Sequence, residues 1–192
     1  MSPRLLRNLL AALGLGIALW WGLAWLGRPR GPAPLVGAGG KEKIAKIEII
    51  RPGSALTFEN LEGWQVTAPR SDGRPVPANA GGVGRLVEAI ADLTLEETIT
   101  ENPSRHAAFE VDEPSGTRLR AVGKDGAVLL DLIVGKASAD GNRLYVRRSG
   151  EAAVRLADGM DPTAVRRDTQ DWFDRTLLRF DPAAVSAVEI RG

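Results

Sequence analysis

The feature that most constrains this chain is a long uncharged apolar run near its start. Residues 8–27, NLLAALGLGIALWWGLAWLG, contain no ionisable side chain. As an α-helix this run would be about 30 Å long, which is the thickness of the hydrocarbon core of a bilayer. Its leucines and Ile17 would favour insertion by about 2.5 to 5 kcal/mol in total, and one central arginine would cancel most of that. The run therefore predicts a single membrane-spanning helix.

The orientation of this helix is judged from the charges that flank it. Arg4 and Arg7 precede the run and Arg28 and Arg30 follow it, so the side-chain charges nearly balance. The α-amino group adds to the N-terminal side, and a short basic tail before an apolar run is typical of a secretory signal. We therefore expect a cytoplasmic N-terminus and an extracytoplasmic C-terminal domain. A cleaved signal peptide is the alternative, but the run is long for one and no clean A-x-A site follows it.

Composition excludes several classes of protein. Residues 1–40 hold four of the 25 Lys+Arg and none of the 24 Asp+Glu, which leaves 21 basic and 24 acidic residues and a formal charge of −3 for the remainder. This lack of a basic surplus argues against a nucleic-acid-binding protein. The chain has no cysteine, which excludes disulfides, a lipoprotein anchor, thiol catalysis and cysteine-ligated metal sites.

The rest of the chain divides into a linker and one module. Prolines and glycines without apolar periodicity predict an extended, flexible stalk over residues 28–42. Residues 43–192 are then expected to form an extracytoplasmic α+β module, with residues 1–27 as the N-terminal tail and spanning helix. Asn79 can cap a helix over residues 80–92. Its buried stripe is expected to be Val83, Leu86, Val87, Ile90 and Leu93.

Alternating apolar runs between turn residues predict that the module is rich in antiparallel hairpins. Ile47 and Ile49 share one face of the first strand, which opens a three-stranded meander. The nearly unbroken apolar run at 127–135 predicts a central strand, and the runs after it predict a hairpin. Asp161-Pro162 and Asp181-Pro182 predict the starts of short capping helices.

The last strand, VSAVEIRG at 185–192, repeats the pattern of the first, IAKIEIIRPG at 44–53. In order, the motifs between them are Gly63-Trp64, TAP at 67–69, NPS at 102–104, DEP at 112–114, VGK at 134–136, YV at 145–146 and DWFDRTLLRFD at 171–181. From Lys43 to Gly192 this series resembles the bacterial domain-of-unknown-function family numbered 4340.

The resemblance implies location and role rather than chemistry. Members of that family are often single-pass membrane proteins, and some are encoded beside gliding-type ABC transporter components. It therefore implies an accessory component of an envelope or ABC-type transport complex at the bacterial inner (cytoplasmic) membrane. The expected partners are the lipid bilayer, through residues 8–27, and ABC transporter or envelope proteins. It also implies that the last strand adds to an edge of the sheet.

One local departure from the family pattern is informative. Family members usually have glycine and leucine after the aromatic residue, whereas this chain has Phe109-Glu110-Val111. If Glu110 takes a left-handed conformation at a helix end, it is strained by about 1 kcal/mol relative to glycine.

No catalytic constellation is evident in the sequence. His106 is the only histidine, so no histidine metal cluster can form, and it is expected on a short exposed helix. Gly135-Lys136 lacks the glycine spacing of a phosphate loop and is expected at a strand end. Asp171 and Asp174 have arginines nearby that offer salt bridges. We predict no catalytic residue, no metal site and no cofactor.

Three aromatic residues of the module are candidates for a binding surface. Trp64, Trp172 and Phe173 are either core pillars, each able to bury about 150 to 250 Å², or an exposed partner-binding patch. With no assembled catalytic site, we expect a membrane-anchored binding or scaffold domain. The alternatives are an extracytoplasmic module that binds wall or glycan fragments in an aromatic-lined groove, or a hydrolase. The hydrolase would use paired carboxylates, from Asp112 and Glu113 or from Asp171 and Asp174.

Overall fold

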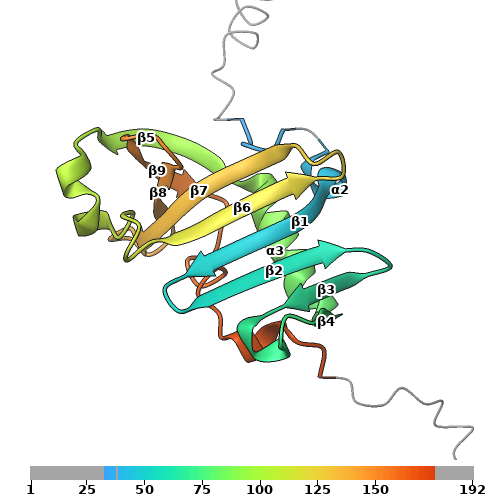
Figure 1. Ribbon diagram of the computed structural model, residues 1–192. Helices are drawn as coiled ribbons and strands as arrows, with labels where there is room; N and C mark the ends of the chain where they lie inside the picture. Colours follow the sequence, from blue (N-terminus) through green and yellow to red (C-terminus); the bar gives the residue numbers. More distant parts are fainter. Residues whose placement is uncertain (1–32, 38, 176–192) are drawn as a thin grey trace, which may run out of the picture. The chain divides into compact units, whose positions relative to one another are not determined.

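The domain is built on one antiparallel sheet (Figure 1). The computed structural model describes residues 33–37 and 39–175, and all statements below concern these residues. The strand order is β4-β3-β2-β1-β6-β7-β8-β9-β5, and neighbouring strands run antiparallel. The strands are β1 (Ile44–Arg51), β2 (Ser54–Asn60), β3 (Trp64–Thr67), β4 (Val76–Pro77), β5 (Thr94–Thr100), β6 (Thr117–Gly123), β7 (Val128–Ala137), β8 (Leu144–Arg148) and β9 (Val154–Asp158).

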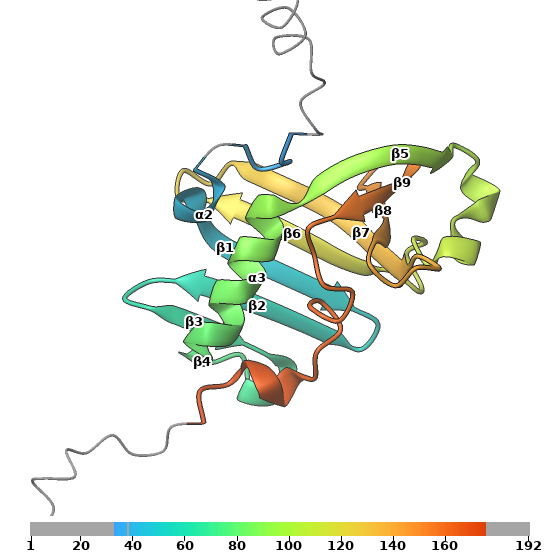
Figure 2. The ribbon, with the colours of Figure 1, turned by 180° about the vertical axis from the view of Figure 1, so that it is seen from behind.

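Helices are few, so the domain is of the α+β class. One of them, α3, is long and lies across β1, β2 and β3 on one face of the sheet (Figure 2). The others are a single turn or little more. The helices are α2 (Gly40–Lys43), α3 (Ala80–Asp92) and the 3₁₀ helices η1 (Pro69–Ser71), η2 (Pro103–Arg105), η3 (Ala107–Phe109) and η4 (Thr169–Trp172).

Some of the sequence predictions fall outside the described residues. The apolar run at 8–27, Asp181-Pro182 and the strand expected at 185–192 are among them. Within the described ranges, no helix combines the length and the apolar character that crossing a membrane requires.

The folded unit begins at Pro34, earlier than the predicted end of the stalk at residue 42. Pro34 forms an isolated bridge with Thr94, and the Leu35 N–H donates a hydrogen bond to the Leu93 carbonyl (2.9 Å). Val36 is only 7% exposed and belongs to the core. Leucine and valine can bury apolar surface against the end of α3, which is why this part of the proline- and glycine-rich segment packs on the domain.

The predicted helix and the first strand have the expected buried faces. Helix α3 starts and ends where the pattern predicted, and the Asn79 side chain accepts a hydrogen bond from the Gly82 N–H (3.0 Å). Ile47 and Ile49 of β1 are fully buried beneath it. The predicted stripe of Val83, Leu86, Val87, Ile90 and Leu93 is buried throughout.

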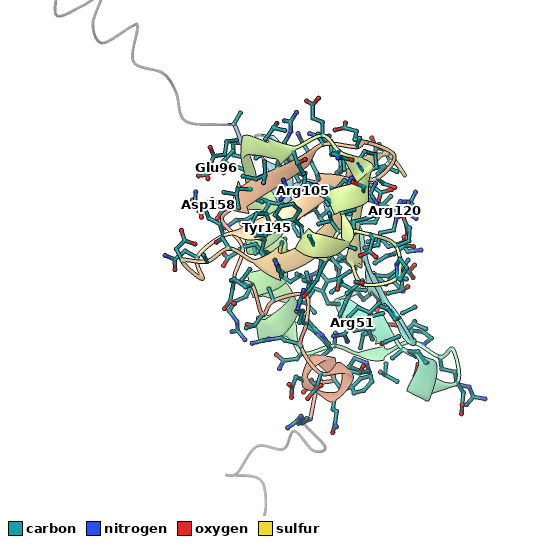
Figure 3. The ribbon with its side chains drawn as sticks, turned by 90° about the vertical axis from the view of Figure 1, so that its left-hand side faces the viewer. Arg51, Glu96, Arg105, Arg120, Tyr145 and Asp158 are labelled. Atoms are coloured by element: carbon teal, nitrogen blue, oxygen red, sulfur yellow. The ribbon has the colours of Figure 1, made fainter. Side chains whose placement is uncertain are left out.

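The opposite face of the sheet carries a ladder of charges across β1, β6 and β7. Glu48 pairs with Lys46 (3.1 Å) and with Arg120 (3.2 Å), and Arg118 pairs with Asp131 (2.8 Å). Arg120 is labelled in Figure 3. These side chains are partly exposed, so each pair contributes at most about 1 kcal/mol. The ladder makes this face polar while α3 covers the apolar face.

Beyond the ladder, the outer face is covered by the segment that leads into β6. Val111 packs with Ile133 and Val154 in a second small core, flanked by Phe109 and Tyr145. The two rings lie 4.7 Å apart between centroids, and Tyr145 is labelled in Figure 3. Loop 109–116 is therefore a packed part of the sheet structure.

Glu110 has the left-handed conformation for which strain relative to glycine is expected. Its φ and ψ are 57° and 32°, at the end of η3. The Arg166 Nη2 donates to Glu110 Oε2 (2.8 Å) and to the Gly135 carbonyl (2.9 Å). The side chain therefore forms a contact that glycine could not form, at the cost of backbone strain.

A comparison of two substitutions separates the strain at Glu110 from its ion pair. Both Glu110→Gly and Glu110→Ala remove the carboxylate, but only glycine accepts a positive φ without strain. We expect the glycine variant to be more stable than the alanine variant by about 1 kcal/mol. Urea unfolding of the full chain followed by circular dichroism would measure this. Equal midpoints and slopes for the two variants would show that the backbone there is unstrained.

The helix predicted to start at Asp161-Pro162 is not formed, so that prediction was wrong. The Asp161 carboxylate does accept a hydrogen bond from the Thr163 N–H (2.7 Å), as a cap would. Turns follow it, with the Arg166 N–H donating to the Thr163 carbonyl (3.0 Å). Met160 and Val165 are both buried in the core. Because core packing fixes the chain at both points, it overrides the local capping signal.

The β7–β8 connection contains Asp140, whose carboxylate accepts hydrogen bonds from the Asn142 N–H and the Arg143 guanidinium of the same turn. The Ser138 hydroxyl and the Arg143 guanidinium hold the pKa of Asp140 at about 2, below its ordinary value of 3.8. A carboxyl with a lowered folded-state pKa adds stability above its unfolded-state pKa, and this stability is lost as pH falls through the folded value. Wild type should therefore lose stability between about pH 4 and pH 2. Asp140→Asn should lose less over that interval in urea unfolding at pH 4, 3 and 2; parallel curves would contradict the role of this carboxylate.

Candidate functional site

The three aromatic residues singled out in the sequence meet at the entry to α3. The Trp64 carbonyl accepts a hydrogen bond from the Ala78 N–H (2.9 Å), and the Trp172 carbonyl accepts one from the Asn79 N–H (2.8 Å). Phe173 forms an isolated bridge with Ala78. Residues far apart in the sequence are thus brought together around the first residues of the helix.

The Trp172 ring is part of the core. It is 1% exposed and lies edge to face with Phe58, with centroids 5.0 Å apart. It therefore offers no exposed ring for stacking on a ligand. Trp64 and Phe173 are half-buried against the same core. A partner-binding role for these two residues stays a prediction.

A cleft opens beside these aromatics, between α3 and the segment that follows β9. Figure 2 shows this segment running down beside α3 to η4. A cavity of about 90 Å³ lies between them, and a second hollow of about 280 Å³ shares Arg85 and Arg167 with it. We call the two together the arginine cleft. It is lined by Asn79, Gly82, Arg85, Leu86, Ala89, Asp161, Thr163, Ala164, Arg167, Asp171, Trp172 and Arg175.

The charged groups of the arginine cleft differ in whether they are paired. Arg175 is held by the Asp171 carboxylate (2.9 Å). The Thr163 backbone N–H and hydroxyl donate hydrogen bonds to Asp161, and together with the nearby positive charge of Arg167 they lower the pKa of its carboxyl. Arg85 and Arg167, in contrast, form no ion pair with any residue that the structure describes. The cleft therefore presents two guanidinium groups outside any salt bridge, and its lining arginines exceed its lining carboxylates by one charge.

The carboxylates proposed for a hydrolase lie in different places. Glu113, 76% exposed at its side chain, borders a separate hollow with Ile50 and Arg51. The Asp112 Oδ1 is buried, with no hydrogen-bond partner among the described residues. Asp171 borders the arginine cleft and is paired with Arg175. Neither of these two hollows is lined by both members of a predicted pair, because Asp112 does not line the one beside Glu113 and Asp174 does not line the one beside Asp171.

His106 and Gly135, the other two positions considered in the sequence, both contact neighbouring segments of the domain. The His106 Nε2 lies 2.8 Å from the Ala152 carbonyl oxygen and joins the end of η2 to the chain before β9. Gly135 lies within β7, where the loop at residues 109–111 packs directly on it.

Sequence reasoning did not identify Arg85 or Arg167 as site residues. It considered the arginines near Asp171 only as salt-bridge partners of the aspartates. Arg85 lies on the exposed side of α3, where an isolated arginine is ordinary. Arg85 and Arg167 come to line one cleft only because residues 161–175 pack against the first turns of α3. No local sequence pattern predicts that long-range packing.

Comparison with known proteins identifies the family. The model of the family Domain of unknown function (DUF4340) matches residues 64–192, more than half of the chain. The matched range begins with β3 and includes α3 and every residue of the arginine cleft, while β1 and β2 precede it. No curated protein and no solved structure matches the chain. This chain belongs to the DUF4340 family.

Proposed function

We propose that the chain is a membrane-anchored, extracytoplasmic binding or scaffold domain that serves as an accessory component of an envelope or ABC-type transport complex. One observation carries the proposal: the uncharged apolar run at 8–27 is followed after a few residues by a compact unit that begins at Pro34. A run of that length can span a bilayer. Such an arrangement tethers a folded domain close to the membrane.

The arginine cleft supports binding as the role of this domain. Two guanidinium groups that have no ion-pair partner among the described residues border a cavity, which is an arrangement suited to holding an oppositely charged group. Of the carboxylates considered for hydrolysis, Asp171 is paired with Arg175 in the cleft, and Glu113 lies 3.7 Å from Arg147 and borders a separate hollow. The link to transport comes from the resemblance to the family and from no contact in the structure.

Membrane topology can be tested with reporters. Alkaline phosphatase fused after Gly192 is expected to be active, because it folds only outside the cytoplasm, while a cytoplasmic reporter at the same position is expected to be silent. The opposite result would invert the proposed localisation. Recovery of the full chain in the aqueous fraction after ultracentrifugation, with residues 1–40 still attached, would contradict the anchor.

The accessory role can be tested separately from the topology. We expect cross-linking in native membranes, followed by capture of the full chain, to recover a second protein in a fixed ratio. Recovery of the chain alone, at a cross-linking yield high enough to trap a stoichiometric partner, would contradict a scaffold function.

A further inference from the structure

The geometry points to the arginine cleft as the binding site for an acidic side chain of a partner protein. In this arrangement a carboxylate lies between Arg85 and Arg167, with a neighbouring apolar side chain in the cavity beside them. The inference rests on the proposed binding function, because it specifies the chemistry of the partner at the cleft.

The first argument concerns the position of the two cations. Arg85 belongs to α3, and Arg167 belongs to the facing segment. The Arg85 Nη1 lies 3.8 Å from the point where a Cβ on Gly81 would lie, and the Arg167 Nη1 lies 3.5 Å from the corresponding point on Gly82. The two guanidinium groups therefore face adjacent residues of one helical turn. Both guanidinium groups also line the same two hollows, so an anion bound in the cleft is attracted by both.

The second argument concerns preorganisation. The Arg167 guanidinium lies over the Trp172 ring, 5.5 Å from its centroid. That ring is fixed in turn by Phe58 and by the hydrogen bond from the Asn79 N–H. The guanidinium is therefore held over a rigid base, so little conformational freedom remains to be lost on binding. A planar guanidinium fork matches the two oxygens of a carboxylate.

The third argument concerns charge and size, which select among anions. The cleft carries three guanidinium groups against the carboxylates of Asp161 and Asp171, a surplus of one positive charge. One carboxylate neutralises this surplus, whereas a phosphate with two charges would overcompensate it. The adjoining cavity of about 90 Å³ is bounded by Leu86, Ala89 and Ala164. It has room for a small apolar group next to the carboxylate, as a peptide segment supplies.

The test uses the full chain in detergent micelles and two labelled peptides. One alternates glutamate and leucine, and the other alternates glutamine and leucine. We expect the glutamate peptide to bind wild type about tenfold or more tightly than the double variant R85Q/R167Q. The glutamine peptide should not distinguish the two proteins. The control variant R51Q/R74Q removes the same charge from two arginines that lie outside the cleft. Within residues 33–37 and 39–175 these arginines also form no ion pair. This variant should bind like wild type.

Each other outcome counts against the inference. Equal binding of the glutamate peptide to wild type and R85Q/R167Q would overturn it, and so would an equal loss in R51Q/R74Q, which would indicate a general charge effect. Displacement of the peptide by inorganic phosphate at a concentration where acetate has no effect would reassign the cleft to phosphate. If R85Q/R167Q fails to fold, the single variant R85Q, at an exposed position, must show the loss.

Cross-linking distinguishes failure of this inference from failure of the proposed scaffold function. If wild type captures a cross-linked partner and R85Q/R167Q captures it equally well, the inference fails while the scaffold function stands. If wild type captures no partner in the membrane, the scaffold function fails whatever the peptides show.

Discussion

Replacing Gly135 with alanine is expected to lower the free energy of unfolding by about 3 kcal/mol. A Cβ at this position would lie 2.1 Å from the Phe109 carbonyl oxygen and 2.7 Å from Val111 Cγ1. The nearest obstacle is backbone, so the loop itself would have to move. That loop is anchored, because the buried Arg147 donates from Nε to the Val111 carbonyl (3.0 Å). Urea unfolding of the full chain, monitored by circular dichroism, would measure the loss.

Gly84 provides the matched control for this substitution. It lies in α3, and a Cβ there would have no heavy atom within 4 Å. Because alanine favours a helix over glycine, Gly84→Ala should raise stability by up to about 1 kcal/mol. The two glycine-to-alanine changes are therefore expected to have opposite signs. A Gly135→Ala variant as stable as wild type would show that loop 109–111 does not pack on β7.

The features predicted correctly from the sequence are those determined by nearby residues. The bounds of α3 follow from a periodic apolar stripe and from the cap at Asn79, both contained within a few turns. The β8–β9 hairpin and the meander of β1 to β3 pair strands that are consecutive in the chain. Short-range pairing leaves few alternatives.

The features that were missed depend on long-range contacts. Strand β5, with the sequence TLEETIT, was not predicted; it lacks strict alternation and lies at the far edge of the sheet beside β9. Strand β6 pairs with β1 across the whole of α3 and β5 in the sequence. The arginine cleft likewise forms only when residues 161–175 return to α3. A sequence pattern indicates the local preference for helix, strand or turn. These long-range contacts depend instead on how the strands and α3 pack in the folded domain.

Trp172→Ala is expected to have the largest effect of the substitutions considered, a loss of about 3 to 5 kcal/mol in the free energy of unfolding. The side chain is 1% exposed and among the largest that are fully buried. Its removal leaves a cavity beside Phe58 and deprives Arg167 of the ring on which it rests. Chemical denaturation of the full chain would measure the loss, and a large fraction of it should be recovered in Trp172→Phe, which refills part of the cavity.

The same substitution tests whether Trp172 acts through the core or through an exposed patch. Substitution of a core residue lowers the free energy of unfolding. Any loss of binding is then a secondary result of deforming the arginine cleft. Leu61, whose side chain is 67% exposed, is the control, and Leu61→Ala should change stability by no more than about 0.5 kcal/mol. If Trp172→Ala left the denaturation midpoint unchanged and abolished capture of a partner, the ring would have to lie on the surface. That outcome would contradict both its packing against Phe58 and its role as the rigid base beneath Arg167.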